Sequence, residues 1–397
     1  MAGISTLGQV LRQIENLTTQ QQQIADLSTQ LATGKKTQTY AGLGTDALTS
    51  VRSRVSISSI DIYINNIQRA ETTIGLELTA LEEFQAQSQQ FSGTLTGFLQ
   101  EGSHQLGEQV LYDDPATPEI EEIVVGNTSA ELDADFEAVI AHAGNLSDFM
   151  TDLLNTKEGD RFVFAGADSQ QQPIDDTGTL DAAVSTLLTD WKNGTITTDE
   201  LIADLQDGTA LDGNPNAITD STIGYSPSLS SDNAGGVFVR ASDNSELEYT
   251  ALANEDNLRN IVVALAVIKN ENFTPIVDVY EDGTYPGTPD VQGAPGTTAS
   301  EQQENFYELY NALAKMVVDG VDGIDSTRFG IESTRAQMEE TKQSHISQQQ
   351  LLINTVSDVE NVDVNEVAVK LSALQVQLQT SYQVTAATQN LTLANFL

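Results

Sequence analysis

The sequence of 397 residues contains no cysteine and only 3 histidines. Without cysteine, disulfide bonds, zinc–thiolate sites and thiol catalysis are excluded. The histidines, at positions 104, 142 and 345, are too far apart to form a metal-binding spacing. No glycine-rich loop follows a strand and opens a helix, as a nucleotide site would require. We therefore expect no metal and no cofactor.

Basic residues are also few, since 17 Lys and Arg stand against 58 Asp and Glu, for a formal net charge of −41. A surface of this sign repels nucleic acid and anionic lipid, so neither is an expected partner. Acidic pairs such as Asp175 and Asp176 arise by chance in so acidic a chain, and we interpret them as solvated surface rather than glycosidase acids. The acidic segment 319–325, predicted to be a turn, lacks the loop length and bidentate glutamate of an EF-hand. The composition thus argues against an enzyme.

Long hydrophobic runs are missing as well. No run of about 18 apolar residues is present, so we expect no membrane-spanning helix. Residues 1–10 lack the basic start and the apolar core of a secretory signal, so any export is expected to occur without a cleaved signal peptide. Residues 371–397 lack charge altogether, although the chain as a whole is strongly acidic.

This uncharged C-terminal stretch is predicted to be a helix with two apolar stripes. Leucines at 371, 374 and 378 continue from Val364 and Val367 at helical spacing, while valines at 362, 369 and 376 recur every seven residues. A helix that is apolar on more than one side needs more than one partner, so we expect neighbouring subunits to bury it. The predicted subunit interface comprises Ile4, Leu7, Leu11, Ile14, Val367, Leu371, Leu374, Val376, Leu378 and Tyr382.

The remaining pattern is mostly helical. Apolar spacing predicts helices over residues 4–31, 46–99, 132–153, 256–269, 300–318 and about 331–359. Breaker-rich composition predicts loops over 37–45, 275–295 and 102–128, the last with at most one helical turn. In residues 161–166, Phe162 and Phe164 are predicted to face one side of a short extended piece. Residues 173–254 combine short helical patches with alternating strand-like runs.

The predicted fold class is mainly α, with long N- and C-terminal helices paired in a coiled-coil or bundle rod and an inserted mixed α/β domain. We predict three domains. The terminal assembly helices comprise residues 1–45 and 361–397, the helical rod comprises 46–172 and 255–360, and the exposed insertion comprises 173–254.

Four motifs carry a family resemblance. The C-terminal sequence LQTSYQVTAATQNLTLANFL, residues 378–397, resembles the C terminus of the flagellin family, and most closely its hook-associated, FlgL-type members, which join hook to filament. The sequence RFVFAG at 161–166 is similar to the signature of that junction protein rather than of filament flagellin, through Phe162, Phe164, Ala165 and Gly166. Residues 31–36 and 357–363 are similar to the family's turns after the first helix and before the last. The Asp-Asp-Pro usual after the first turn is replaced by Gly44-Thr-Asp-Ala.

The resemblance implies a non-enzymatic structural subunit of the extracellular bacterial flagellum. It implies that the terminal helices form an inner tube, and that the partners are other copies of the chain, an adjacent hook-associated protein and flagellin. It also implies export through the flagellar type III apparatus, with a cytoplasmic chaperone on the C-terminal helix. Two alternatives remain open: a filament flagellin, and a flagellin-like surface adhesin that binds glycans through residues 173–254.

Overall fold

The computed structural model describes residues 2–100, 107–113, 120–126, 130–206, 217–230, 235–271, 294–295 and 299–394. The chain divides into two compact units. The terminal unit contains residues 1–65 and 341–397, and the central unit contains residues 66–340. The boundary between them falls inside two long helices, α2 (Ala47–Gln100) and α8 (Ala299–Glu360).

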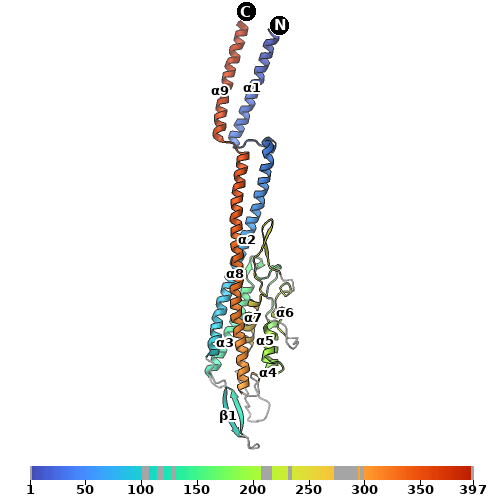
Figure 1. Ribbon diagram of the computed structural model, residues 1–397, viewed down its shortest axis with the longest axis vertical. Helices are drawn as coiled ribbons and strands as arrows, with labels where there is room; N and C mark the ends of the chain where they lie inside the picture. Colours follow the sequence, from blue (N-terminus) through green and yellow to red (C-terminus); the bar gives the residue numbers. More distant parts are fainter. Residues whose placement is uncertain are drawn as a thin grey trace. The chain divides into compact units, whose positions relative to one another are not determined.

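The terminal unit consists of helices from both ends of the chain. It contains α1 (Ala2–Thr33), the 3-10 helix η1 (Tyr40–Asp46), the first part of α2, the last part of α8, and α9 (Val364–Ala394). Helices α1 and α9 lie side by side with the two termini at the same end, so they run antiparallel (Figure 1). Gly34 follows α1 with φ 70°, a left-handed conformation that glycine adopts without strain. The predicted end of the first helix is therefore confirmed.

The central unit combines helices with small antiparallel sheets. Its helices, besides parts of α2 and α8, are α3 (Ala130–Leu154), α4 (Gly178–Lys192), α5 (Thr198–Gln206), α6 (Asp220–Ile223) and α7 (Asp256–Asn270). Three two-stranded sheets are described, pairing β1 (Gly107–Asp113) with β2 (Ile120–Gly126), β3 (Lys157–Glu158) with β4 (Arg161–Phe162), and β5 (Phe238–Ser242) with β6 (Ser245–Glu248). The predicted mainly α fold class, with paired terminal helices and a small inserted sheet region, is confirmed.

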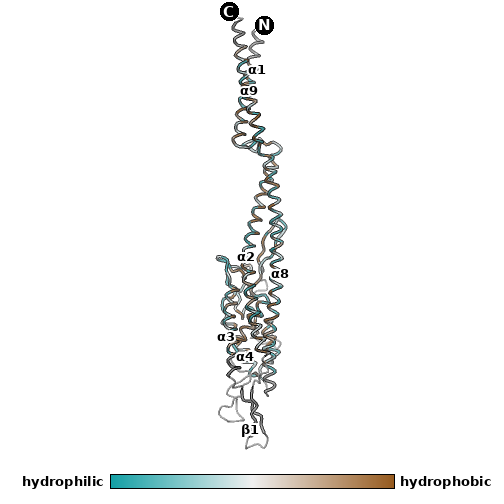
Figure 2. The backbone as a smooth tube through the Cα atoms, turned by 90° about the vertical axis from the view of Figure 1, so that its left-hand side faces the viewer, coloured by the Kyte–Doolittle hydropathy of each residue, from teal (hydrophilic) through white to brown (hydrophobic). Residues whose placement is uncertain are grey.

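One hydrophobic core runs through the central unit. On α2, Ile67, Ile74 and Leu81 recur every seven residues and are fully buried. They share the core with residues of α3, α7 and α8, and with Trp191 of the inserted segment. Figure 2 shows apolar and polar residues alternating along α8, as expected for a helix that buries one face. The insertion thus has no separate core, and the predicted division into three domains stays a prediction.

Residues 319–325 form part of the continuous helix α8, so the predicted acidic turn is wrong. The two glycines in this segment explain the error. A Cβ at Gly320 would lie 2.6 Å from the Asn257 carbonyl oxygen, and one at Gly323 would lie 2.5 Å from the Asn257 Cβ. These glycines let α7 pack closely on α8 rather than breaking the helix. The carboxylates of this segment are therefore spread around a helix, and no cation-binding loop exists there.

The predicted irregular connection over 102–128 is also wrong, because it contains a β-hairpin. Strands β1 and β2 pair in antiparallel register, with Gln109 opposite Val124 and Leu111 opposite Glu122. Residues 101–106, 114–119 and 127–129 lie outside the described part of the chain. The two prolines that suggested a loop lie between two short runs rich in strand-forming residues, and part of the acid cluster lies within the strands themselves. Most of the predicted loop 275–295 also lies outside the described residues.

The extended piece predicted at 161–166 is shorter than expected. Strand β4 ends at Phe162, and the next residues bend. Phe162, Val163, Phe164 and Ala165 are all buried, so the two phenylalanines do not share a single buried face of an alternating strand. Val163 and Phe164 instead belong to the hydrophobic core of the central unit.

A candidate assembly surface on the terminal helices

The seam between α1 and α9 is an antiparallel heptad packing. Its half-buried apolar residues on α1 are Leu17, Ile24, Leu27 and Leu31. On α9, Val367 is buried, and Leu371, Leu374 and Leu378 are half-buried. Spacings of three and four on both helices are those of a coiled coil. The structure therefore brings four residues of the predicted interface, Val367, Leu371, Leu374 and Leu378, onto the face of α9 that packs within the chain.

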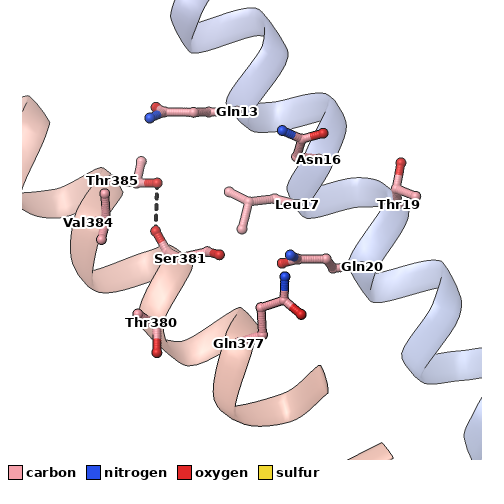
Figure 3. A pocket seen from close by; sticks show the side chains of 10 residues that line it. All are labelled: Gln13, Asn16, Leu17, Thr19, Gln20, Gln377, Thr380, Ser381, Val384 and Thr385. Carbon is pink, nitrogen blue, oxygen red and sulfur yellow. Dashed lines mark hydrogen bonds between the residues drawn. The ribbon is translucent and has the colours of Figure 1, made fainter. Parts of the chain in front are cut away.

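Toward the termini this seam opens into a polar groove of about 510 Å³. Figure 3 shows Leu17 pointing from α1 toward α9, and the amides of Gln20 and Gln377 pointing into the same gap. The lining residues are uncharged: Gln13, Asn16, Leu17, Thr19, Gln20, Gln377, Thr380, Ser381, Val384 and Thr385. The Oε1 atom of Gln20 is buried without a hydrogen-bond partner among the described residues. A buried polar atom of this kind is normally satisfied by another group.

A second set of apolar residues on the terminal helices is exposed rather than buried in the seam. On α9, Val369 and Val376 are exposed, with 64% of the Val376 surface accessible, whereas the exposed Val384 lines the groove. On α1, Leu11 and Ile14 are 58% and 54% exposed. Tyr382 is also exposed, and its hydroxyl accepts a hydrogen bond of 2.7 Å from Gln21 Nε2. The side chains of Ile4 and Leu7 lie outside the described residues.

The exposed apolar residues have a counterpart on α2, in a segment that the sequence predicted to belong only to the rod. Leu48, Val51, Val55 and Ile62 are exposed within the terminal unit. Their spacings of three, four and seven follow a heptad pattern, as do those of the buried Ile60, Ile67 and Ile74 on the same helix. A second stripe on this helix, offset from the core stripe, was the signal in the sequence that could have identified these residues.

A cluster of charged side chains around Glu360 joins the connection between α1 and α2 to the connection between α8 and α9. Glu360, the last residue of α8, is nearly inaccessible and accepts hydrogen bonds from Arg54 Nε at 2.8 Å and from the buried Ser50 hydroxyl. Lys35, just after α1, forms an ion pair of 2.9 Å with the same carboxylate. The main chain is joined here as well, because Lys36 N–H donates to the Glu360 carbonyl. One carboxylate therefore links the end of α1, α2 and the end of α8.

These contacts shift the titration of the cluster. The hydrogen bond from Arg54, followed by that from Ser50, holds the pKa of Glu360 well below the usual range of a carboxyl group. The same hydrogen bond to Glu360 raises the pKa of Arg54. Both shifts favour the charged forms, so the cluster is an ion pair network across the neutral pH range.

The family signature residues lie in the central unit and have a packing role. Phe162, Phe164 and Ala165 are buried. Gly166 has φ 63°, and a Cβ there would lie 2.6 Å from the Gly235 carbonyl oxygen, so only glycine fits. The signature contacts the end of the inserted segment, because the Ala253 N–H donates to the Phe164 carbonyl oxygen.

Charge is divided sharply between the units. The terminal unit contains 7 basic and 8 acidic residues, whereas the central unit contains 10 basic and 50 acidic residues. Among the described residues no group of three or more His, Cys, Asp or Glu side chains could hold a metal ion. Within the described ranges, no helix combines the length and apolarity needed to cross a membrane.

Comparison with known proteins identifies the C-terminal part of the chain. Residues 315–397 match the model of the bacterial flagellin C-terminal helical region. A solved structure described as a "putative flagellar hook-associated protein" from Vibrio parahaemolyticus is similar with a TM-score of 0.40 and 8% sequence identity. That likeness covers 79% of this chain and 97% of that chain. No curated protein matches the sequence.

A structural likeness of this degree determines neither fold nor function, so the identification rests on the C-terminal region. That region includes much of α8 and all of α9, the helix that carries both apolar stripes. The match of residues 315–397 to the bacterial flagellin C-terminal helical region supports the resemblance to the flagellin family that the motifs of the sequence indicated.

Proposed function

We propose that this chain is a structural, non-enzymatic subunit of the bacterial flagellum that assembles with other copies through its terminal unit. The observation that carries the proposal is the coincidence of three properties in one unit. It has almost no net charge, it exposes apolar heptad stripes, and it contains the C-terminal part of the match to the flagellin C-terminal region.

The driving force for assembly is burial of the exposed stripes. Fully burying one Val, Leu or Ile side chain contributes about 1.5–3 kcal/mol. Several such residues on each of α1, α2 and α9 together offset the entropy lost when copies associate. The near neutrality of the terminal unit matters because copies of it approach one another without strong like-charge repulsion. The polar groove between α1 and α9 supplies amide and hydroxyl partners for uncharged side chains of a neighbouring copy.

Within the flagellum, we assign the chain to the hook–filament junction. The support is the RFVFAG sequence at 161–166, which is similar to the junction protein's signature. The partners would then be copies of this chain, an adjacent hook-associated protein and flagellin. Export would proceed without a cleaved signal peptide, with a chaperone on α9 covering the exposed stripe until assembly. The protein would be extracellular, at the base of the filament.

Copy number and position on the cell test this assignment. A subunit labelled by a specific antibody should give one compact band at the end of the hook, as seen by electron microscopy. Label along the whole filament would instead identify a filament flagellin. Label spread over the cell surface and absent from flagella would overturn the flagellar role and favour the adhesin alternative.

The assembly surface is tested by adding charge to the exposed stripe of α9. The double substitution Val369→Asp with Val376→Asp should abolish incorporation into flagella, because two desolvated carboxylates would be buried between copies. Gln375→Asp is the matched control, since it places a charge on the same helix without removing an apolar side chain. Fluorescence of the single tryptophan, Trp191, should be unchanged in both variants, because it is buried in the central unit. Normal incorporation of the double variant would contradict the proposal.

A further inference from the structure

The backbone at residues 250–253, where the inserted segment returns to the helices of the central unit, is held by two carboxyl groups. Glu77 of α2 accepts a hydrogen bond from the backbone N–H of Ala251. Glu255, just before α7, accepts one of 3.2 Å from the N–H of Leu252. The successive N–H groups of Ala251 and Leu252, which follow β6, are therefore bound by two glutamates that are far apart in the sequence.

The two glutamates have very different surroundings. Glu77 is fully buried, and its Oε2 atom has no hydrogen-bond partner among the described residues. The Oε2 atom of Glu255 accepts a hydrogen bond of 2.8 Å from the Thr327 hydroxyl of α8. Glu255 is thus satisfied as a carboxylate, whereas a charged Glu77 would keep one oxygen buried and unsolvated. A buried ionised carboxylate without a partner is strongly unfavourable.

The charged and titratable groups around Glu77 reinforce this difference. Glu255 acts on Glu77 as a like charge, and Glu77 in turn acts on the Tyr249 hydroxyl, which also interacts with Arg161 and Glu158. Loss of water on burial, more than the nearby Glu255, raises the pKa of Glu77 to about 9. At neutral pH the group is therefore an uncharged carboxylic acid that still accepts the hydrogen bond from Ala251.

We propose that Glu77 is a proton-dependent latch that holds the return of the inserted segment on α2 when neutral and releases it when it loses its proton. A charged Glu77 draws water or moves toward it, which breaks the close packing of residues 250–253. The folded state binds this proton more tightly than the unfolded state. The contribution of protonated Glu77 to the stability of the folded state is therefore complete below the ordinary glutamate pKa, and it is lost as the pH rises toward 9.

The test compares the full chain with Glu77→Gln, which keeps the acceptor oxygen and removes the titration. Amide hydrogen exchange of residues 250–253, corrected for the intrinsic pH dependence, should become on the order of a hundredfold faster in the wild type between pH 6 and 9. The Gln variant should show little change over the same range. Glu82→Gln, at an exposed position of the same helix, should behave like the wild type.

Equal pH dependence of exchange in the wild type and in Glu77→Gln would overturn the proposal. A direct measurement covers the case in which the Gln variant does not fold. The carboxyl carbon of Glu77, observed by NMR in the wild-type chain, should titrate above pH 7. Titration of that carbon near the ordinary glutamate value would equally rule out the latch.

Discussion

The terminal and central units differ in where their apolar residues lie and in how much charge they carry. Helix α2 passes through both, and its isoleucines show the contrast. Ile62, in the terminal unit, is 57% exposed, whereas Ile74, in the central unit, is fully buried. The central unit buries most of its large apolar residues in one core and is highly acidic, while the terminal unit is nearly neutral and leaves many of its apolar residues exposed. The comparison indicates that the central unit has a well-formed core within one chain, whereas the terminal unit exposes an apolar surface, which the proposed assembly would bury.

The largest expected effect is on stability, and it compares the same substitution, Ile to Ala, at two positions of α2, one in each unit. Ile74→Ala should reduce the free energy of unfolding of the central unit by about 2–5 kcal/mol, because it opens a cavity in a packed core. Ile62→Ala should change the stability of the isolated chain by less than about 0.5 kcal/mol. Thermal unfolding followed by Trp191 fluorescence and circular dichroism measures both. A comparable loss in the two variants would show that Ile62 is already covered within the chain.

A smaller effect on stability is expected at the Glu360 cluster, whose contribution to the terminal unit depends on pH. Glu360→Gln should destabilise the terminal unit by about 1–3 kcal/mol at pH 7, because it removes charge-assisted hydrogen bonds from Arg54 and Ser50. The pKa of Glu360 is lowered in the folded chain, so this contribution is present above the ordinary glutamate pKa and is lost as the pH falls below it. Hydrogen exchange of residues 34–50 at pH 3 and pH 7 measures it.

Glu366→Gln is the control for this experiment. Glu366 forms an exposed pair with Lys370 on α9, and such pairs contribute little to stability. It should leave exchange at residues 34–50 unchanged at both pH values. If Glu360→Gln also leaves it unchanged, the cluster does not hold the two connections together. The terminal unit is thus expected to weaken in acid, whereas the central unit, through Glu77, is expected to weaken in alkali.

The smallest expected effect is that of salt. Raising the ionic strength from 0.01 M to 1 M shortens the Debye length from about 30 Å to about 3 Å. Screening should stabilise the central unit, where acidic residues repel one another, and leave the terminal unit of the isolated chain nearly unchanged. Hydrogen exchange resolved by unit measures this difference. Equal stabilisation of both units would show that charge segregation has no energetic consequence.

Helical spacing in the sequence was sufficient to predict much of this architecture, and the errors have physical causes. The first helix, its end at Gly34 and the helix at 256–269 follow from local pattern and are confirmed. The segment 319–325 was misread because glycine in a helix can serve either to end it or to allow close packing. Only the position of α7 distinguishes the two, and that position depends on contacts distant in sequence.

Only part of the candidate site could be predicted from the sequence. Two stripes on α9 were visible as separate spacings, but which of them packs on α1 depends on the tertiary arrangement. The predicted interface mixes seam residues such as Leu374 with outward residues such as Val376 for that reason. The Glu360 cluster was not predicted, because it joins Lys35, Ser50 and Arg54 across more than 300 positions of sequence.

Hydrogen exchange of α1 and α9 in the dilute isolated chain and in the assembled form, at one pH, tests the central claim most directly. We expect weak protection of these helices in the isolated chain and strong protection after assembly, while the central unit changes little. Strong protection of α1 and α9 in the isolated chain, equal to that of the central core, would contradict the claim that other copies cover the terminal unit.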